Sequence, residues 1–104
     1  MTKAVKKATK KSAAKWVVVR TYSAGVHCGE LASRDGTTAV LRNARRIWRW
    51  RGANTLHEVA LRGVDMEYSR ISEPVEEITL TQAIEVISAT AAARENLEVS
   101  RWPK

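Results

Sequence analysis

The sequence contains very few of the side chains that bind metals or form cross-links. Its 104 residues include one cysteine, Cys28, and two histidines, His27 and His57. A single cysteine excludes an intramolecular disulfide, and the chain has neither a CxxC nor an HxxxH spacing. We therefore expect no metal site and no cofactor.

Long apolar runs are also missing. No segment approaches the roughly 18 consecutive apolar residues of a membrane-spanning helix, and the N-terminus lacks the apolar stretch of a secretory signal. We therefore expect a cytoplasmic protein that makes no contact with a membrane.

Catalytic motifs are missing as well. Ser23 lacks a GxSxG context, and the chain has no glycine-rich phosphate loop. His27 and Cys28 pair a base with a nucleophile, but adjacent side chains on a strand point to opposite faces. We expect Cys28 in the core and His27 facing outward. The side chains of Glu76 and Glu77 point to opposite faces for the same reason. Because the sequence offers no catalytic arrangement of residues, we expect that the protein is not an enzyme.

The net charge of +7 is distributed unevenly. Residues 1–15 carry +6, residues 16–62 carry +5 and residues 63–104 carry −4. The first segment is a low-complexity mixture of Lys, Ala, Thr and Ser that cannot offset its own ordering entropy. We expect a disordered basic tail over residues 1–15 and a single small α+β domain over residues 16–104.

The tail can attract polyanions only weakly and without sequence preference, so weak, tail-mediated nucleic-acid binding is expected at low salt. The lysines expected to make these contacts are Lys3, Lys6, Lys7, Lys10, Lys11 and Lys15.

The first half of the domain has the pattern of an antiparallel meander. Segments 16–23, 26–32 and 37–50 are rich in β-branched and aromatic residues, and Ala24-Gly25 offers a turn between the first two. Asp35-Gly36 suits a type I′ hairpin. That turn would place Leu31 opposite Val40 and Gly29 opposite Arg42.

The second half predicts two short helices and two more strands. Thr55 with Glu58 forms a capping box and Gly63 suits a C-cap, so we expect a helix between them. Residues 64–74 have the composition of a loop, and 90–98 indicate a second helix. Residues 75–80 and 83–88 each indicate a strand, although the Ala and Glu content of 83–88 also fits a helix. Trp102 packs on a neighbour or marks an interface. The expected fold is α+β: an antiparallel β-meander sheet with two short helices and a disordered Lys-rich tail.

The most distinctive stretch is "RNARRIWRWRG", residues 42–52, with five arginines and two tryptophans. Strand alternation would place Arg46, Trp48 and Trp50 on one face and the intervening residues on the other. The candidate ligand-binding residues are Arg42, Asn43, Arg45, Arg46, Trp48, Arg49, Trp50 and Arg51.

Three interpretations of this stretch remain open. The acidic second half of the chain can neutralise the arginines through salt bridges. Alternatively, arginines and tryptophans can bind the phosphates and bases of a nucleic acid, although no nucleic-acid-binding motif is present. Finally, they can hold a small anionic nucleotide in a pocket. In so small a domain we expect such a pocket between protomers of a homo-oligomer.

The segments "VRTYSAGVHCGELASRDG", "LRNARRIWRWRGA" and "PVEEITLTQAIEVI" resemble a small uncharacterised domain family found in bacteriophage and prophage genomes. The resemblance covers nearly all of residues 16–90. It implies a viral origin and a compact α+β domain, and it carries over no catalytic residues. Some small viral proteins act as sponges, which bind host immune nucleotide signals and withhold them from the host. This comparison rests on the type of protein and not on a shared sequence motif.

These observations together lead to a functional hypothesis. We expect a non-enzymatic, phage-type binding protein that sequesters an anionic nucleotide-type ligand, such as a host immune cyclic-nucleotide signal, in an Arg/Trp-lined pocket. The alternative is a basic nucleic-acid-binding protein, and the third hypothesis is a protein-protein inhibitor of a host factor. The expected location is the cytoplasm of an infected or lysogenic bacterial host.

Overall fold

The computed structural model describes residues 15–99, which form a six-stranded antiparallel sheet and two short helices. The expected α+β class is therefore confirmed. Apart from Lys15, the expected tail lies outside the described residues, as does Trp102. The strands are β2 (Trp16–Thr21), β3 (Val26–Asp35), β4 (Thr38–Arg49), β5 (Arg70–Ile71), β6 (Val75–Leu80) and β7 (Ala83–Ser88), and the helices are α3 (Leu56–Arg62) and α4 (Ala91–Leu97).

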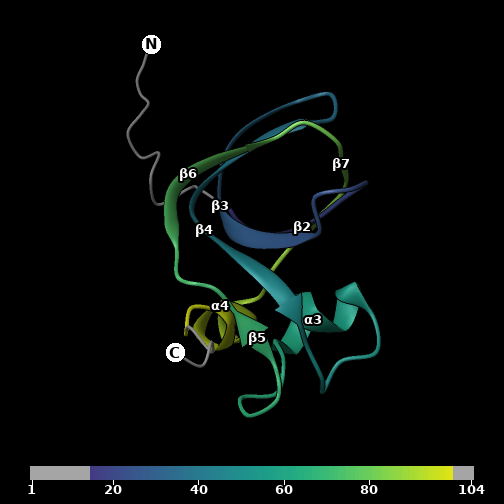
Figure 1. The fold of residues 1–104 in the computed structure, drawn as a ribbon, viewed down its shortest axis with the longest axis vertical. Helices are drawn as coiled ribbons and strands as arrows, with labels where there is room; N and C mark the ends of the chain where they lie inside the picture. The colour runs from purple at the N-terminus through teal and green to yellow at the C-terminus, as the bar shows by residue number, and fades with distance from the viewer. Residues whose placement is uncertain (1–14, 100–104) are drawn as a thin grey trace.

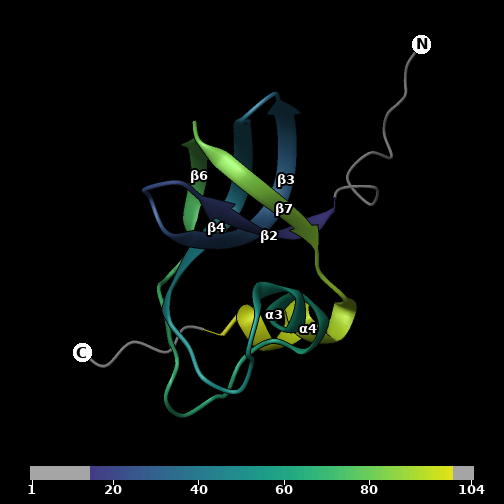
Figure 2. The same cartoon turned by 90° about the vertical axis from the view of Figure 1, so that its right-hand side faces the viewer.

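The strand order is β5-β4-β3-β2-β7, with β6 also paired to β4. The long strand β4 pairs with β6 along its first part, where Ala39 is opposite Leu80, and with β5 near its end, where Ile47 is opposite Ile71. The strands curl into a ring in Figure 1. Figure 2 shows α3 and α4 together on one side of this ring.

Alternation along β2 divides the apolar side chains between two clusters. Trp16 and Val18 belong to a helix-side cluster, whereas Val17 and Val19 belong to an inner cluster built from the strands. The other buried members of the helix-side cluster are Cys28, Ile47, Val59, Ala60, Val64, Ile71 and Leu97. Those of the inner cluster are Ala39, Leu41, Ala44, Leu80 and Ala83.

A β-bulge at Asn43 interrupts β4. Cys28 is opposite Arg45 but Glu30 is opposite Arg42, so β4 has one extra residue in this interval. Asn43 has a φ of 50°, in the left-handed region. Gly29 makes room for the bulge, because a Cβ there would lie 2.9 Å from the Arg42 carbonyl oxygen. The prediction that Gly29 faces Arg42 is therefore wrong.

The β3–β4 turn also differs from the prediction. Asp35 is opposite Thr38, so Gly36 and Thr37 form the turn. Gly36 has a φ of 59° while Thr37 has no positive φ, which fits type II′ rather than type I′. A second register shift, between Leu31 and Ser33, then places Leu31 opposite Leu41 and not Val40.

The helix expected between Thr55 and Gly63 is confirmed as α3, and the helix expected over residues 90–98 is confirmed as α4. Thr55 Oγ1 accepts a hydrogen bond from the Glu58 N–H at 3.3 Å, and Gly63 follows α3 with a φ of 82°. Thr90 Oγ1 accepts from the Ala93 N–H at 3.0 Å at the start of α4. Each helix has seven residues, and the described part of the chain contains no helix able to span a membrane.

The two-residue strand β5 was not predicted. It lies in residues 64–74, which have the composition of a loop, and it pairs only with the end of β4. The strands predicted at 75–80 and 83–88 are confirmed as β6 and β7.

Candidate functional site

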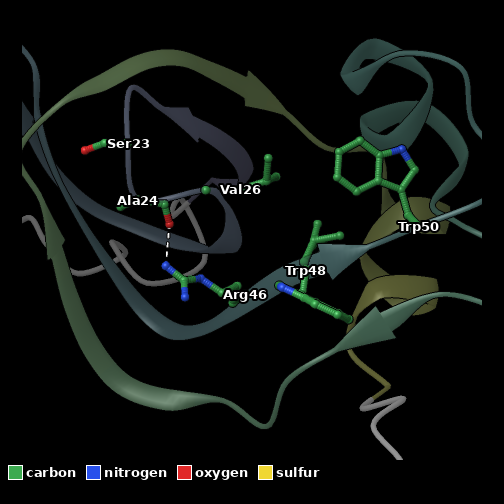
Figure 3. Close-up of a pocket in the computed structure, with 8 residues that line it drawn as sticks. Ser23, Ala24, Val26, Arg46, Trp48 and Trp50 are labelled. Atoms are coloured by element: carbon green, nitrogen blue, oxygen red, sulfur yellow. Dashed lines mark hydrogen bonds between the residues drawn. The ribbon is translucent and has the colours of Figure 1, made fainter.

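A pocket lies where the β2–β3 turn meets the end of β4 (Figure 3). Its volume is about 410 Å³, and we call it the Arg46 pocket. The lining residues are Ser23, Ala24, Gly25, Val26, Arg46, Ile47, Trp48 and Trp50.

Local hydrogen bonds hold the turn that forms one wall of this pocket. The Gly25 carbonyl oxygen accepts from both the N–H and the hydroxyl of Thr21, at 3.0 and 2.8 Å. The Ala24 N–H donates to Thr21 Oγ1 at 2.8 Å. Gly25 has a φ of 87°, which only glycine adopts readily. The turn is therefore pinned to the end of β2.

Arg46 is fixed at both its backbone and its side chain. Its N–H donates to Ser72 Oγ at 2.9 Å, and its carbonyl oxygen accepts from the Ser72 N–H at 3.0 Å. The guanidinium donates to the Ala24 carbonyl oxygen, as drawn in Figure 3. A guanidinium has five N–H donors, and most of those of Arg46 have no acceptor within residues 15–99, so they are available to a ligand.

The two tryptophans contribute differently to the pocket. Trp48 is 58% exposed, whereas Trp50 is partly buried against the helix-side cluster. In Figure 3 their rings lie on opposite sides of β4. A register shift between Ile47 and Arg49 interrupts the alternation that would have placed both rings on one face. The structure still brings Arg46, Trp48 and Trp50 to one pocket, which wraps around this end of the sheet.

Three other candidate residues take part in the architecture of the sheet. Arg42 forms an ion pair with Glu77 at 3.6 Å, and both side chains are more than half exposed. Asn43 makes the bulge, and Arg45 donates to the Ser72 carbonyl oxygen at 3.2 Å. None of these three is among the lining residues of the Arg46 pocket.

Arg49 and Arg51 are exposed and also lie outside the lining of the Arg46 pocket. The Arg51 guanidinium lies 5.2 Å from the centre of the Tyr68 ring. Within residues 15–99, neither of them nor Arg46 forms an ion pair with a carboxylate. Among the described residues, a carboxylate from the acidic half of the chain therefore neutralises Arg42, but none pairs with these three arginines.

His27 is buried, and the expectation that it faces outward is wrong. It lies opposite Arg46 in the β3–β4 ladder. Burial, together with the positive charge of Arg46, lowers the pKa of His27 to about 4. Its Nδ1 atom has no hydrogen-bond partner among the described residues. At neutral pH Arg46 therefore has a neutral imidazole as its neighbour. Cys28 is in the core, as predicted.

A second pocket of about 430 Å³ adjoins the first, and we call it the Arg20 pocket. It shares Val26 and Trp50 with the Arg46 pocket. Its other lining residues are Arg20, Asn54, Thr55, Leu56, His57 and Glu85. This pocket was not predicted, because its polar residues come from β2, from α3 and the residues just before it, and from β7, and no local motif connects them.

The described residues include no group of three or more His, Cys, Asp or Glu side chains able to hold a metal ion. The polar side chains of the two pockets are instead arginines, indoles, one Ser and one Thr hydroxyl, and single His, Asn and Glu side chains. Such side chains can bind a phosphate, stack on a flat ring and accept hydrogen bonds from amino or hydroxyl groups.

Comparison with other proteins supplies a family. No curated protein and no solved structure matches this chain. A family model described as "Domain of unknown function (DUF6948)" matches residues 14–97, which is nearly the whole of the described domain. The chain therefore belongs to the DUF6948 family.

Proposed function

We propose that the chain is a non-enzymatic binding protein for an anionic, nucleotide-type ligand, which it holds in the Arg46 pocket. The observation that carries the proposal is the position in a single pocket of two indole rings and one guanidinium that has no carboxylate partner within residues 15–99. Charge-assisted bonds from Arg46 would bind a phosphate. A base would stack on Trp48 or Trp50, an interaction worth roughly 1 to 3 kcal/mol per base.

The size and rigidity of the pocket support this ligand class. A volume of about 410 Å³ lies within the range of small-molecule sites. Arg46 is held by Ala24 and Ser72, and Trp50 is packed against the helix-side cluster, so two of the three binding groups are already ordered. Preorganised groups lose less entropy on binding.

The phage and prophage resemblance of the sequence suggests a setting for this binding. In the cytoplasm of an infected or lysogenic bacterium, the protein would act as a sponge that withholds a host nucleotide signal. We also propose that several copies associate, because large exposed side chains outside the pocket, such as Tyr22 and Met66, are commonly covered in an assembly. Sedimentation at micromolar concentration should then show a dimer or larger species, and a monomer throughout would contradict this association.

Calorimetric titration of the full-length chain with linear and cyclic nucleotides tests the binding. Arg46→Ala and Trp48→Ala should each reduce affinity at least about tenfold. Matched controls are Arg34→Ala and Tyr68→Ala, because both residues are exposed and neither lines the Arg46 pocket.

Two results would contradict the proposal. One is the absence of binding to every nucleotide tested. The other is an equal loss of affinity in Arg34→Ala and Arg46→Ala, because binding would then reflect general positive charge. Binding of long nucleic acid that is insensitive to Arg46→Ala would instead favour the basic nucleic-acid-binding alternative.

A further inference from the structure

We propose that the Arg46 and Arg20 pockets are two subsites of one groove that accepts two linked nucleotide units, a dinucleotide. This inference rests on the proposed function and deepens it, because it names the ligand class and assigns a role to the second pocket. Val26 and Trp50 line both pockets, so the two spaces lie on either side of a common wall.

The two pockets are matched in size. Their volumes are about 410 and 430 Å³, and each lies within the range of small-ligand sites. The wall between them is well supported, because Trp50 and Val26 both pack against the helix-side cluster. Each pocket therefore has room for one nucleotide unit, and the shared wall keeps the two units adjacent.

The sheet fixes the distance between the two arginines. Arg20 on β2 is opposite Val26 on β3, and Val26 is opposite Ile47 on β4, the residue next to Arg46. Two strand spacings separate the ends of this row, or about 10 Å. Arg20, Val26 and Ile47 share the helix-side face of the sheet, whereas Arg46, the neighbour of Ile47, points to the other face. A ligand that contacts both guanidiniums would therefore pass around the end of β3 at Val26, the residue that lines both pockets.

The charge on Arg20 is also available to a ligand. Arg20 is exposed and forms no ion pair within the described residues. Glu85 lies opposite it in the β2–β7 ladder, but the two side chains do not meet as an ion pair. Each subsite therefore presents one guanidinium that has no carboxylate partner in the described part of the chain.

The Glu85 carboxylate should favour a second nucleoside over a longer phosphate chain in the Arg20 pocket. If the triphosphate of a single nucleotide extended from the Arg46 pocket, its last phosphates would approach the Glu85 carboxylate and be repelled. A second nucleoside instead offers hydroxyl or amino donors that a carboxylate accepts. His57, in the same pocket, provides a flat ring against which a base or sugar can pack.

Calorimetry on the full-length chain with adenosine monophosphate, a 5′-phosphorylated adenylyl dinucleotide and adenosine triphosphate tests the inference. The dinucleotide should bind at least about tenfold more tightly than the monophosphate, because linked units bind as one ligand. Arg20→Ala should remove this gain without changing the affinity for the monophosphate. Glu85→Gln should raise the affinity for the triphosphate, and Arg34→Ala serves as the control for general charge.

Different results would overturn the two proposals separately. If the monophosphate binds but the dinucleotide gains nothing, or if Arg20→Ala weakens both ligands equally, the two-subsite inference is wrong and the Arg46 site stands. A steady further gain with longer oligoadenylates would also overturn it, because the groove would then be part of a strand-binding surface. If neither ligand binds, the proposed function itself fails.

Discussion

The two halves of the arginine-rich stretch have different surroundings, although their compositions are similar. Residues 42–45 are part of the sheet's own architecture. Arg42 pairs with Glu77, Asn43 forms the bulge, and Arg45 donates to the Ser72 carbonyl oxygen. The charged groups of this half have partners within the domain.

Residues 46–51 instead border the pockets and the solvent. Arg46 lacks a carboxylate partner within residues 15–99, and Trp48 is more than half exposed beside it. The β2–β3 turn, which ends against Arg46, accounts for the difference, because it lines a pocket at this end of β4. A cluster of arginines in a sequence therefore does not show which of them have partners in the sheet and which of them line a pocket.

The largest expected effect is on the architectural half. Gly29→Ala places a Cβ 2.9 Å from the Arg42 carbonyl oxygen and 3.0 Å from the Ala44 Cα. Both atoms belong to backbone that cannot rotate away, so the free energy of unfolding should fall by about 3 kcal/mol, at the upper end of overpacking effects. Urea denaturation measures the change.

Asn43→Gly is the matched control for the bulge. Glycine adopts a φ of 50° without steric cost, so this variant should be as stable as the parent chain. If Gly29→Ala is equally stable, the bulge does not need the close approach of the two strands.

The next effect concerns His27, which lies at the boundary between the two halves. Its pKa is lowered from 6.5 to about 4, so between these values the unfolded chain binds a proton that the folded chain does not. The free energy of unfolding should therefore fall as the pH falls, by about 2 kcal/mol between about pH 7 and about pH 5. Urea denaturation over this range gives the slope.

His27→Gln removes the titrating group and should flatten the pH dependence over that range, whatever its effect on absolute stability. An unchanged slope in His27→Gln would show that another group causes the loss. The pKa of Glu58 is also lowered, chiefly by a hydrogen bond from the Asn54 backbone N–H, but that carboxylate starts from 4.5 and acts at lower pH.

Features with a local cause could be predicted from the sequence. The first strand and the caps at Thr55 and Gly63 depend on residues a few positions apart, and the structure confirms them. The bulge at Asn43 could not be predicted in the same way. It requires Gly29 on the neighbouring strand, and that pairing is known only when the register is known.

The same distinction between local and distant causes applies to the residues of the candidate site. Arg46, Trp48 and Trp50 are close in sequence, so their proximity was predictable even though the register shift after Ile47 changes the direction of the rings. Arg20, His57 and Glu85 come from three distant elements. They come together only through the pairing of β2 with β7 and the packing of α3. No spacing of residues in the sequence predicts that pairing or that packing.

The smallest expected effect is at the exposed ion pair of the architectural half. Arg42→Ala and Glu77→Ala should each change the free energy of unfolding by less than about 1 kcal/mol, because solvent screens a pair whose side chains are both more than half exposed. A double-mutant cycle by urea denaturation measures the coupling. Arg42→Ala should also leave nucleotide affinity unchanged, in contrast to Arg46→Ala. If calorimetry shows that the two variants lose affinity equally, the division of the stretch at residue 46 is wrong, and its arginines act as one diffuse positive surface.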